Sequence, residues 1–325
     1  MEFGWWLLRR LAYAAGLLLA VAVLNFSLIH MAPGDIVQTI VGEMGGASEE
    51  TIAQLTKAYG LDKSFLDQLW IYVSRVATGD LGHSLYFNRP VLGLILDRVP
   101  ATVLLVVTAL SMAIVTGTFL GVMAARYPAT WLGALVTIVA LFGFSAPVFW
   151  SGLMLLLLFA SVFELLPASG MYDVAQGATG FAYALDVAYH LILPAGTLAL
   201  IYLALYSRLS RASMLEVLGS DYVRTARAKG LSENKVVFKH ALRNAILPVV
   251  TVAGLQFSAM LAGAVLVETV FTWPGMGQLA FESILRRDNQ LILGILLLSA
   301  VLVIIGNLLT DFAYRIVDPR IKTGG

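Results

Sequence analysis

The residues of this sequence best suited to chemistry are cations gathered in one stretch. Residues 221–243 hold six lysines and arginines and two acids, and the chain turns apolar at Ala245. Such cations can pair with acidic side chains or with phosphate groups. The sequence has no cysteine, and we find no metal-ligand spacing, no nucleophile beside a base and no Gly-rich phosphate loop with a lysine. The chain alone is therefore not predicted to be an enzyme, and we assign no catalytic or metal-binding residue.

The basic stretch is predicted to fold as two short helices that meet at a glycine. Tyr222, Ala226 and Lys229 recur at helical spacing, Gly230 can end that helix, and Ser232 can cap the next. A connection of this length is usually either functional or disordered, and the helical pattern favours function. A basic collar held by anionic lipid headgroups is the alternative interpretation.

Composition places these helices in a membrane protein. Apolar residues make up 59% and charged residues 13% of the 325-residue chain, and the mean hydropathy is +0.85. About 25% charged residues is usual for a soluble domain. Six apolar runs are long enough for helices that cross about 30 Å of hydrocarbon. They cover residues 11–29, 101–125, 132–163, 188–206, 245–271 and 291–317. We therefore predict an all-α integral membrane protein with six transmembrane helices, and the net charge of only +1 argues against a nucleic-acid partner.

The distribution of cations predicts the orientation in the membrane. Most of the 21 lysines and arginines fall in segments on the same side as the basic stretch, and the positive-inside rule places that side in the cytoplasm together with both termini. The chain then divides into a cytoplasmic N-terminus with the first span (1–32), an outside helical cap (33–100) and a five-span core (101–325). The core contains the basic loop (207–244).

The outside segments have a weaker pattern. In the cap, Ser48 can begin a helix that ends at Gly60, and Ser64 can begin a second one that ends at Gly79. These helices either cover the outer ends of the spans or contact a substrate. The second outside loop, 164–189, offers no site that the sequence identifies.

Ionisable residues within the apolar runs are few and lie near their ends. Among them are His30, Glu164, Glu268 and Asp311, in or directly beside the ends of the runs. We expect such side chains to reach the membrane interface, so we assign them no function. Gly117 and Gly121 have the spacing of close helix contacts, and Pro147 and Pro194 are expected to begin or kink helices.

Residues 226–231, Ala-Arg-Ala-Lys-Gly-Leu, with 221–225 before them and 240–244 after them, resemble the coupling-loop signature of ABC-importer permeases in the dipeptide, oligopeptide and nickel branch. The resemblance covers the whole chain. It includes Arg9-Arg10, Pro33-Gly34-Asp35, Gly79-Asp80-Leu81-Gly82, Pro100-Ala101-Thr102, Trp273-Pro274-Gly275-Met276-Gly277 and Asp318-Pro319-Arg320, in this order. The broader permease signature has Glu-Ala-Ala where this chain has Arg224, Thr225 and Ala226, and Leu-Pro where it has Leu242-Arg243. Both departures resemble the peptide and nickel branch.

The resemblance implies a subunit of an ATP-driven importer in the cytoplasmic membrane of a bacterium or archaeon. Its partners would be a second homologous permease subunit, two ATPase subunits that bind ATP and magnesium, and a periplasmic or lipid-anchored substrate-binding protein. This chain would hold no cofactor. The implied ATPase-coupling residues are Asp221, Tyr222, Arg224, Thr225, Ala226, Arg227, Ala228, Lys229, Gly230, Leu231, His240 and Arg243. Small Ala226 and Ala228 would permit close packing on an ATPase, and Gly230 would supply the turn.

The resemblance favours dipeptides or short oligopeptides as the substrate. Nickel complexes, glutathione-like peptides, opines and oligosaccharides remain alternatives. A secondary transporter is a different class, which should show paired half-sequences and ionisable residues at mid-membrane. A structural or assembly protein of the membrane is a third.

The segment between the last two spans allows two interpretations. It consists of Trp273, Pro274, Gly275, Met276 and Gly277. Tryptophan suits the membrane interface, proline fixes φ and glycine allows tight turns, so the segment can be an interfacial anchor. Alternatively, it helps to close the outer end of the transport pathway.

Overall fold

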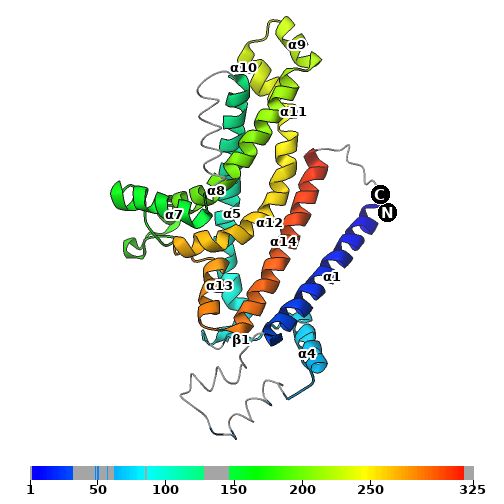
Figure 1. The fold of residues 1–325 in the computed structure, drawn as a ribbon, viewed down its shortest axis with the longest axis vertical. Coiled ribbons are helices and arrows are strands. Elements are labelled where there is room, and N and C mark those ends of the chain that lie inside the picture. The colour runs from blue at the N-terminus through cyan, green and yellow to red at the C-terminus, as the bar shows by residue number, and fades with distance from the viewer. Residues whose placement is uncertain are drawn as a thin grey trace. The chain divides into compact units, whose positions relative to one another are not determined.

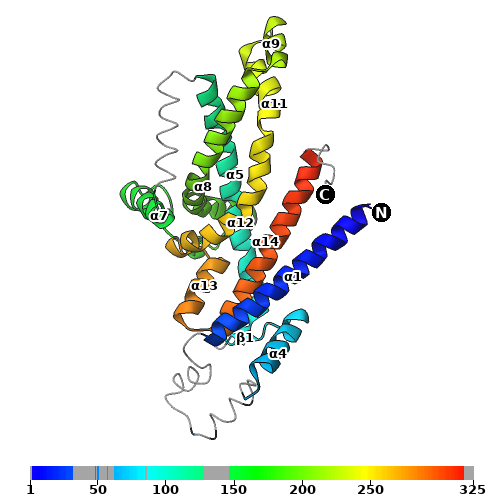
Figure 2. The same ribbon diagram turned by 45° about the vertical axis from the view of Figure 1, so that its right-hand side comes forward.

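The computed structural model describes residues 2–31, 62–84, 86–127 and 146–317, and the single residues 48, 50 and 57. Most of these residues are helical (Figures 1 and 2). The chain forms two units, Met1–Val99 with Leu279–Ile304 and Pro100–Gln278 with Ile305–Gly325. The three-part organisation expected from the sequence stays a prediction, and the units differ from it because residues 279–304 join the N-terminal unit.

Among the described residues, five helices are long and apolar enough to cross a membrane. They are α1 (Glu2–Met31), α5 (Val91–Arg126), α8 (Gly180–Leu218), α12 (Leu247–Val270) and α14 (Asn289–Val317). The predicted class of helical membrane protein is confirmed. The expected span 132–163 begins outside the described residues. Its C-terminal part forms the apolar helix α7 (Val148–Leu156), which Pro147 precedes, and the π-helix η1 (Leu157–Val162).

In the N-terminal unit, α1 packs against α4 (Phe65–Ala77). Ser64 caps α4 as predicted, since its hydroxyl oxygen accepts a hydrogen bond from the Asp67 amide at 3.3 Å, and Gly79 follows the helix with a φ of +79°. The ring of Tyr72 stacks on Phe26 at 5.4 Å, and burial raises the pKa of Tyr72 to about 12. The other predicted cap helix lies almost entirely outside the described residues.

A short hairpin follows the cap in the chain and contacts the start of α14 within the same unit. Its antiparallel strands are β1 (His83–Ser84) and β2 (Arg89–Pro90). The Ser84 hydroxyl donates to the Asp288 carboxylate, which also accepts the Leu291 amide at 3.1 Å and so caps α14. Gln290 donates to the Leu81 carbonyl at 2.8 Å. Buried polar contacts therefore fix residues 81–84 to the first turn of α14.

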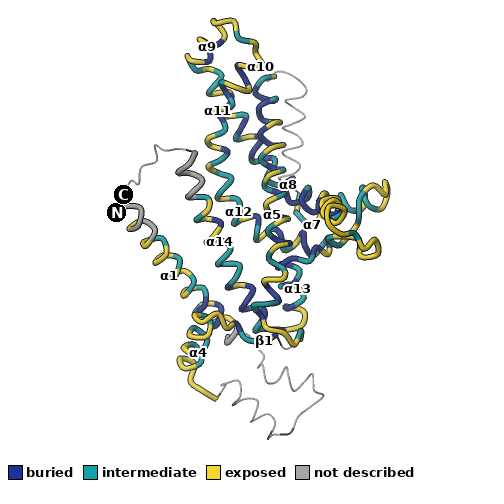
Figure 3. Tube along the Cα trace, turned by 180° about the vertical axis from the view of Figure 1, so that it is seen from behind, coloured by how far each residue is buried: buried dark blue, intermediate teal, exposed yellow. Residues whose placement is uncertain are grey.

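The second unit is built on close contact between α5 and α8. A Cβ atom added at Gly121 would lie 2.4 Å from the Ser207 carbonyl oxygen, and one at Gly117 would lie 2.8 Å from Tyr206 Cβ. The prediction of a close helix contact at these two glycines is confirmed. Figure 3 shows buried positions along both helices. With 39 residues, α8 is about 58 Å long, so it extends well beyond a hydrocarbon layer of about 30 Å.

Short elements complete the second unit. They are the 3-10 helix η2 (Val174–Gln176), α9 (Asp221–Ala228), α10 (Glu233–Lys235), the π-helix η3 (Val236–Ala241), α11 (Leu242–Ala245) and α13 (Met276–Leu285), whose first residues belong to this unit. Four of them, α9 to α11 with η3, form the basic loop. The loop leads into α12, which has Pro248 in its first turn.

Candidate functional site

The basic loop folds as the sequence predicts, at the end of the long helix α8. Helix α9 ends at Ala228 with Lys229 as its C-cap residue, and Gly230 turns the chain with a φ of +73°, a conformation that favours glycine. Ser232 occupies the capping position of α10, but its side chain makes no capping hydrogen bond. Figure 1 shows the loop at one extremity of α8, and Figure 2 shows it again after rotation. The loop is thus a folded projection on an extended helix.

The buried face of α9 packs in a hydrophobic cluster. Its members are Val122, Ala125, Met214, Val223, Ala226, Val236, Val237, Ala241 and Ala245. Ala226 is only 7% exposed and packs inside the chain, and its role in ATPase coupling stays a prediction. The exposed face of α9 carries Tyr222, Arg224, Thr225, Arg227 and Ala228, followed by Lys229. Of the two small residues, Ala228 is the one available to a partner.

Polar contacts stiffen the loop across its turn. Arg227 donates to both carboxylate oxygens of Glu233, at 2.8 and 3.2 Å. This hydrogen-bonded pair lowers the pKa of Glu233 and raises that of Arg227. Asn244 donates to the Tyr222 hydroxyl at 2.8 Å. One predicted docking cation, Arg227, therefore already has a partner within the loop.

The remaining predicted coupling residues take different positions. Asp221 opens α9 and lies 3.4 Å from Arg224, with both side chains exposed. Leu231 is half-buried after the turn, and His240 is half-buried in η3. Arg243 is exposed on α11. The structure brings the set together in one loop, with its cations on the outside.

Trp273 is the largest fully buried side chain among the described residues. Its indole Nε1 donates to the Ala101 carbonyl at 2.9 Å, and its backbone amide donates to the Glu268 carbonyl at 2.8 Å. This burial contradicts the interpretation of Trp273 as an interfacial anchor. The segment is instead held against the start of the second span, which leaves the outer-closure interpretation open.

Glu268 is also fully buried, contrary to the expectation that it reaches the membrane interface. Its carboxylate accepts hydrogen bonds from the Thr102 hydroxyl at 2.7 Å and from the amides of Gly277 at 2.6 Å and Gln278 at 3.2 Å. The Met276 amide donates to the Thr102 oxygen at 2.7 Å. Sequence reasoning missed this site. The available signal was an acid at the end of a span shortly before a segment with two glycines.

The two glycines of this segment are needed for a reason other than the predicted turns. Neither Gly275 nor Gly277 is among the residues with positive φ. A Cβ atom at Gly275 would lie 2.3 Å from Glu268 Cδ, and one at Gly277 would lie 2.4 Å from Val265 Cα. Glycine is required because the backbone passes so close to the carboxylate and to α12. Of the other span-end acids and histidine, Glu164 is exposed, and the side chains of His30 and Asp311 lie outside the described part of the chain.

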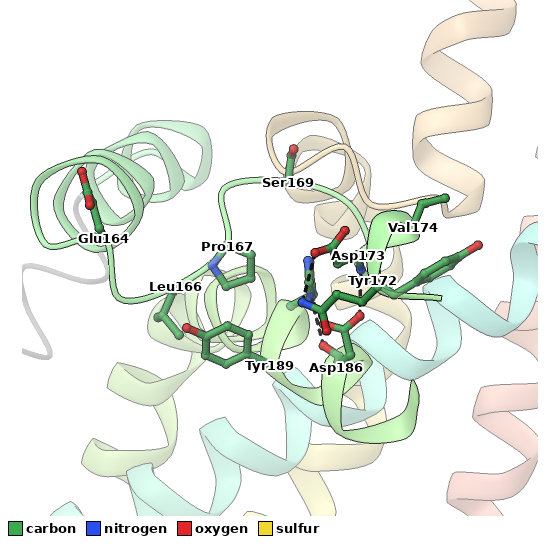
Figure 4. A pocket seen from close by; sticks show the side chains of 11 residues that line it. Glu164, Leu166, Pro167, Ser169, Tyr172, Asp173, Val174, Asp186 and Tyr189 are labelled. Atoms are coloured by element: carbon green, nitrogen blue, oxygen red, sulfur yellow. Dashed lines mark hydrogen bonds and ion pairs between the residues drawn. The ribbon is translucent and has the colours of Figure 1, made fainter. Parts of the chain in front are cut away.

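A cavity of about 450 Å³ lies under the loop 164–190, for which the sequence suggested no site. Figure 4 shows Asp173, Asp186 and Tyr172 together on one side of it and Glu164 on the other. The Asp186 carboxylate accepts the Asp173 amide at 2.7 Å and lies 3.0 Å from the His190 ring. Asp173 caps η2. These acids organise the loop itself, so the cavity by itself does not indicate a ligand.

Within the described residues, no group of three or more His, Asp or Glu side chains is placed to hold a metal ion. Residues 117–323 match the family described as binding-protein-dependent transport system inner membrane component. Residues 4–106 match the N-terminal model of the same kind of membrane component. The chain belongs to this family.

Curated relatives of this permease cover nearly its whole length. The dipeptide transport system permease protein DppB of Escherichia coli K12 is 42% identical over 333 residues, which is 97% of this chain and 98% of the relative. The di/tripeptide permease DppB of Pseudomonas aeruginosa is 42% identical, with 97% of each chain covered. The oligopeptide permease AppB of Bacillus subtilis is 37% identical, with 98% and 99% covered.

Solved structures support the fold of the permease. A chain of the MetNI methionine ABC transporter in an inward-facing conformation aligns with a TM-score of 0.54 at 16% identity, covering 70% of this chain and 97% of that one. At this identity the likeness concerns the fold alone. The family makes the protein a multi-pass inner-membrane component of a binding-protein-dependent transport system, which works with ATPase and substrate-binding partners.

Proposed function

We propose that this permease imports dipeptides or short oligopeptides as one half of a translocation pathway. A second homologous permease subunit supplies the other half, two ATPase subunits hydrolyse ATP, and a substrate-binding protein delivers peptide from outside. The peptide names of relatives 37–42% identical over nearly the full length support this substrate class. This chain hydrolyses nothing and transmits movement.

The exposed face of α9 on its rigid support is the observation that carries the coupling role. Val223 and Ala226 hold the helix on the hydrophobic cluster, and the pair Arg227–Glu233 closes the turn at Gly230. A partner that pushes on α9 therefore moves the end of α8 with it. Such rigid-body transmission is how closure of an ATPase pair can reach the spans. Orientation of the loop towards the cytoplasm follows from the cation distribution.

Tryptophan substitutions distinguish docking from the lipid collar. In a reconstituted complex, Ala228→Trp on the exposed face should reduce ATPase retention and transport together, because it separates the docked surfaces. Ala212→Trp, at an exposed alanine of α8, is the matched control and should retain both. Wild-type retention and transport in Ala228→Trp would contradict the docking role. If lipid headgroups hold the loop, removal of Arg224 and Lys229 should weaken function in proportion to charge and lose its effect at high salt.

The substrate class is tested with the purified binding protein and labelled dipeptides. Saturable, ATP-dependent uptake of a dipeptide into vesicles that contain the complete complex is the expected result. Uptake of nickel complexes, opines or oligosaccharides, with no peptide uptake, would contradict the peptide assignment and leave the ATPase docking test unaffected.

A further inference from the structure

The buried carboxylate of Glu268 satisfies backbone groups that its own helix does not contain. The first amides of an α-helix have no intrahelical acceptor. At the start of α13, the Gly277 and Gln278 amides donate to Glu268 of α12, and the Met276 amide donates to Thr102 of α5. Two different spans therefore cap the helix that follows the Trp273 segment. A carboxylate also interacts favourably with the positive end of the helix dipole.

The same two side chains contact each other. The Thr102 hydroxyl donates to Glu268 at 2.7 Å while its oxygen accepts the Met276 amide. The Trp273 indole adds a fourth attachment, to the Ala101 carbonyl. In this arrangement every one of these groups is buried or half-buried, and the cost of leaving a buried acceptor or donor unpaired is what keeps them together.

The backbone is shaped around the carboxylate. Gly275 passes so close that an added Cβ would lie 2.3 Å from Glu268 Cδ. An apolar side chain in place of Glu268 would fill the space but would accept no hydrogen bond from the Gly277 and Gln278 amides. The acid thus has a positioning role that simple packing would not require.

We propose that Glu268 and Thr102 form a clasp that fixes residues 273–278 to α5 at Thr102 and to the C-terminal end of α12, so that the outer end of the pathway opens and closes as one rigid body. Glu268 is a positioning residue of transport and contacts no substrate. This inference rests on the proposed transport function, because it specifies which groups couple the outer loop to the moving spans.

The clasp is tested in the complete complex with Glu268→Gln, Thr102→Val and Thr102→Ser. The first weakens the acceptor, the second removes one hydroxyl at nearly constant volume, and the third retains that hydroxyl. We expect Glu268→Gln and Thr102→Val to assemble but to hydrolyse ATP without binding protein at a raised rate, so that stimulation by binding protein falls towards onefold. Thr102→Ser should behave as wild type. Because both groups belong to one network, the double variant should be no worse than the more severe single variant.

A second readout needs no substrate. The native chain has no cysteine, so Gln278→Cys introduces a unique thiol in the clasped segment. An impermeant thiol reagent should label it about tenfold faster in the Glu268→Gln and Thr102→Val backgrounds, since loss of a hydrogen bond to a charged group shifts an opening equilibrium by at least about that factor. Glu164→Gln, the same change at an exposed acid, is the control and should leave the labelling rate unchanged.

The two readouts separate the possible failures. Wild-type labelling and stimulation in both Glu268→Gln and Thr102→Val would overturn the clasp. If Glu268→Gln fails to assemble, Thr102→Val against Thr102→Ser decides alone, because a purely structural role would lower the yield without changing the ratio of stimulated to unstimulated hydrolysis. Faster labelling in a complex that transports no peptide would retain the clasp and contradict only the substrate class.

Discussion

Arg227 and Glu233 form a two-point ion pair across the turn at Gly230, with nitrogen–oxygen distances of 2.8 and 3.2 Å. Both side chains are over a third exposed, so solvent screens the pair and limits its contribution to about 1 kcal/mol or less. The pair therefore affects the local conformation of the basic loop more than the overall stability of the protein.

The first prediction concerns the pH dependence of this pair. Because the pKa of Glu233 is lowered below its ordinary value of 4.5, the stabilisation is fully present above pH 4.5 and is lost as the pH falls through the lowered pKa. Hydrogen-exchange protection of residues 229–236 should thus be constant between about pH 5 and 8 and decrease in more acidic solution. Glu233→Gln should lower protection slightly and remove the acidic decrease. An equal decrease in both proteins would assign it to other groups.

The second prediction concerns the contact between α5 and α8. Gly121→Ala places a methyl group 2.4 Å from the Ser207 carbonyl oxygen, which backbone atoms cannot easily avoid, so we expect a loss of about 1–3 kcal/mol in stability. Thermal unfolding of the detergent-solubilised protein measures it. Gly93→Ala is the matched control in the same helix, since nothing lies within 4 Å of its added Cβ, and it should retain stability.

The third prediction concerns Gly230. Its added Cβ would meet nothing within 4 Å, so a substitution there is disfavoured by the φ of +73° alone. We expect Gly230→Val to cost about 1–3 kcal/mol in the loop and to reduce ATPase retention, whereas Gly230→Asn, which tolerates this region, should retain most of it. Co-purification of the ATPase subunits gives the measurement. Equal retention by the valine and asparagine variants would show that the strained turn is not required.

The fourth prediction concerns orientation. Thr179 is an exposed residue directly before α8, and Ser232 is an exposed residue in the basic loop that follows the other end of this helix. Cysteine at Thr179 should react with an impermeant thiol reagent from outside, and cysteine at Ser232 should react only after the membrane is opened. Labelling of Ser232→Cys from outside in intact vesicles would contradict the proposed cytoplasmic orientation of the basic loop.

The sequence predicts those parts of the structure that depend on local signals. Helical spacing and capping residues identify α9 and the turn at Gly230 because these signals act within a few residues. The spacing of Gly117 and Gly121 likewise predicts a close helix contact. Neither pattern specifies which partner a helix face meets.

The missed features depend on residues far apart in the chain. Glu268 meets Thr102 across 166 positions, and Met276 meets Thr102 across 174. Considered alone, an acid such as Glu268 or a tryptophan such as Trp273 near the end of a span is expected at the membrane interface. Similarly, the periodicity of α9 does not distinguish buried Ala226 from exposed Ala228, because the hydrophobic cluster beneath them comes from several helices.

Because α8 is long, a small tilt of this helix displaces its far end by several ångströms. From Pro194 to Leu218 the helix extends about 36 Å, so a tilt of about 5° at the proline would displace the basic loop by about 3 Å, roughly the length of a hydrogen bond. A small angular change within the membrane can therefore make or break specific contacts at the far end of the helix. Conversely, a displacement of the basic loop by a few ångströms corresponds to only a small change of angle at Pro194.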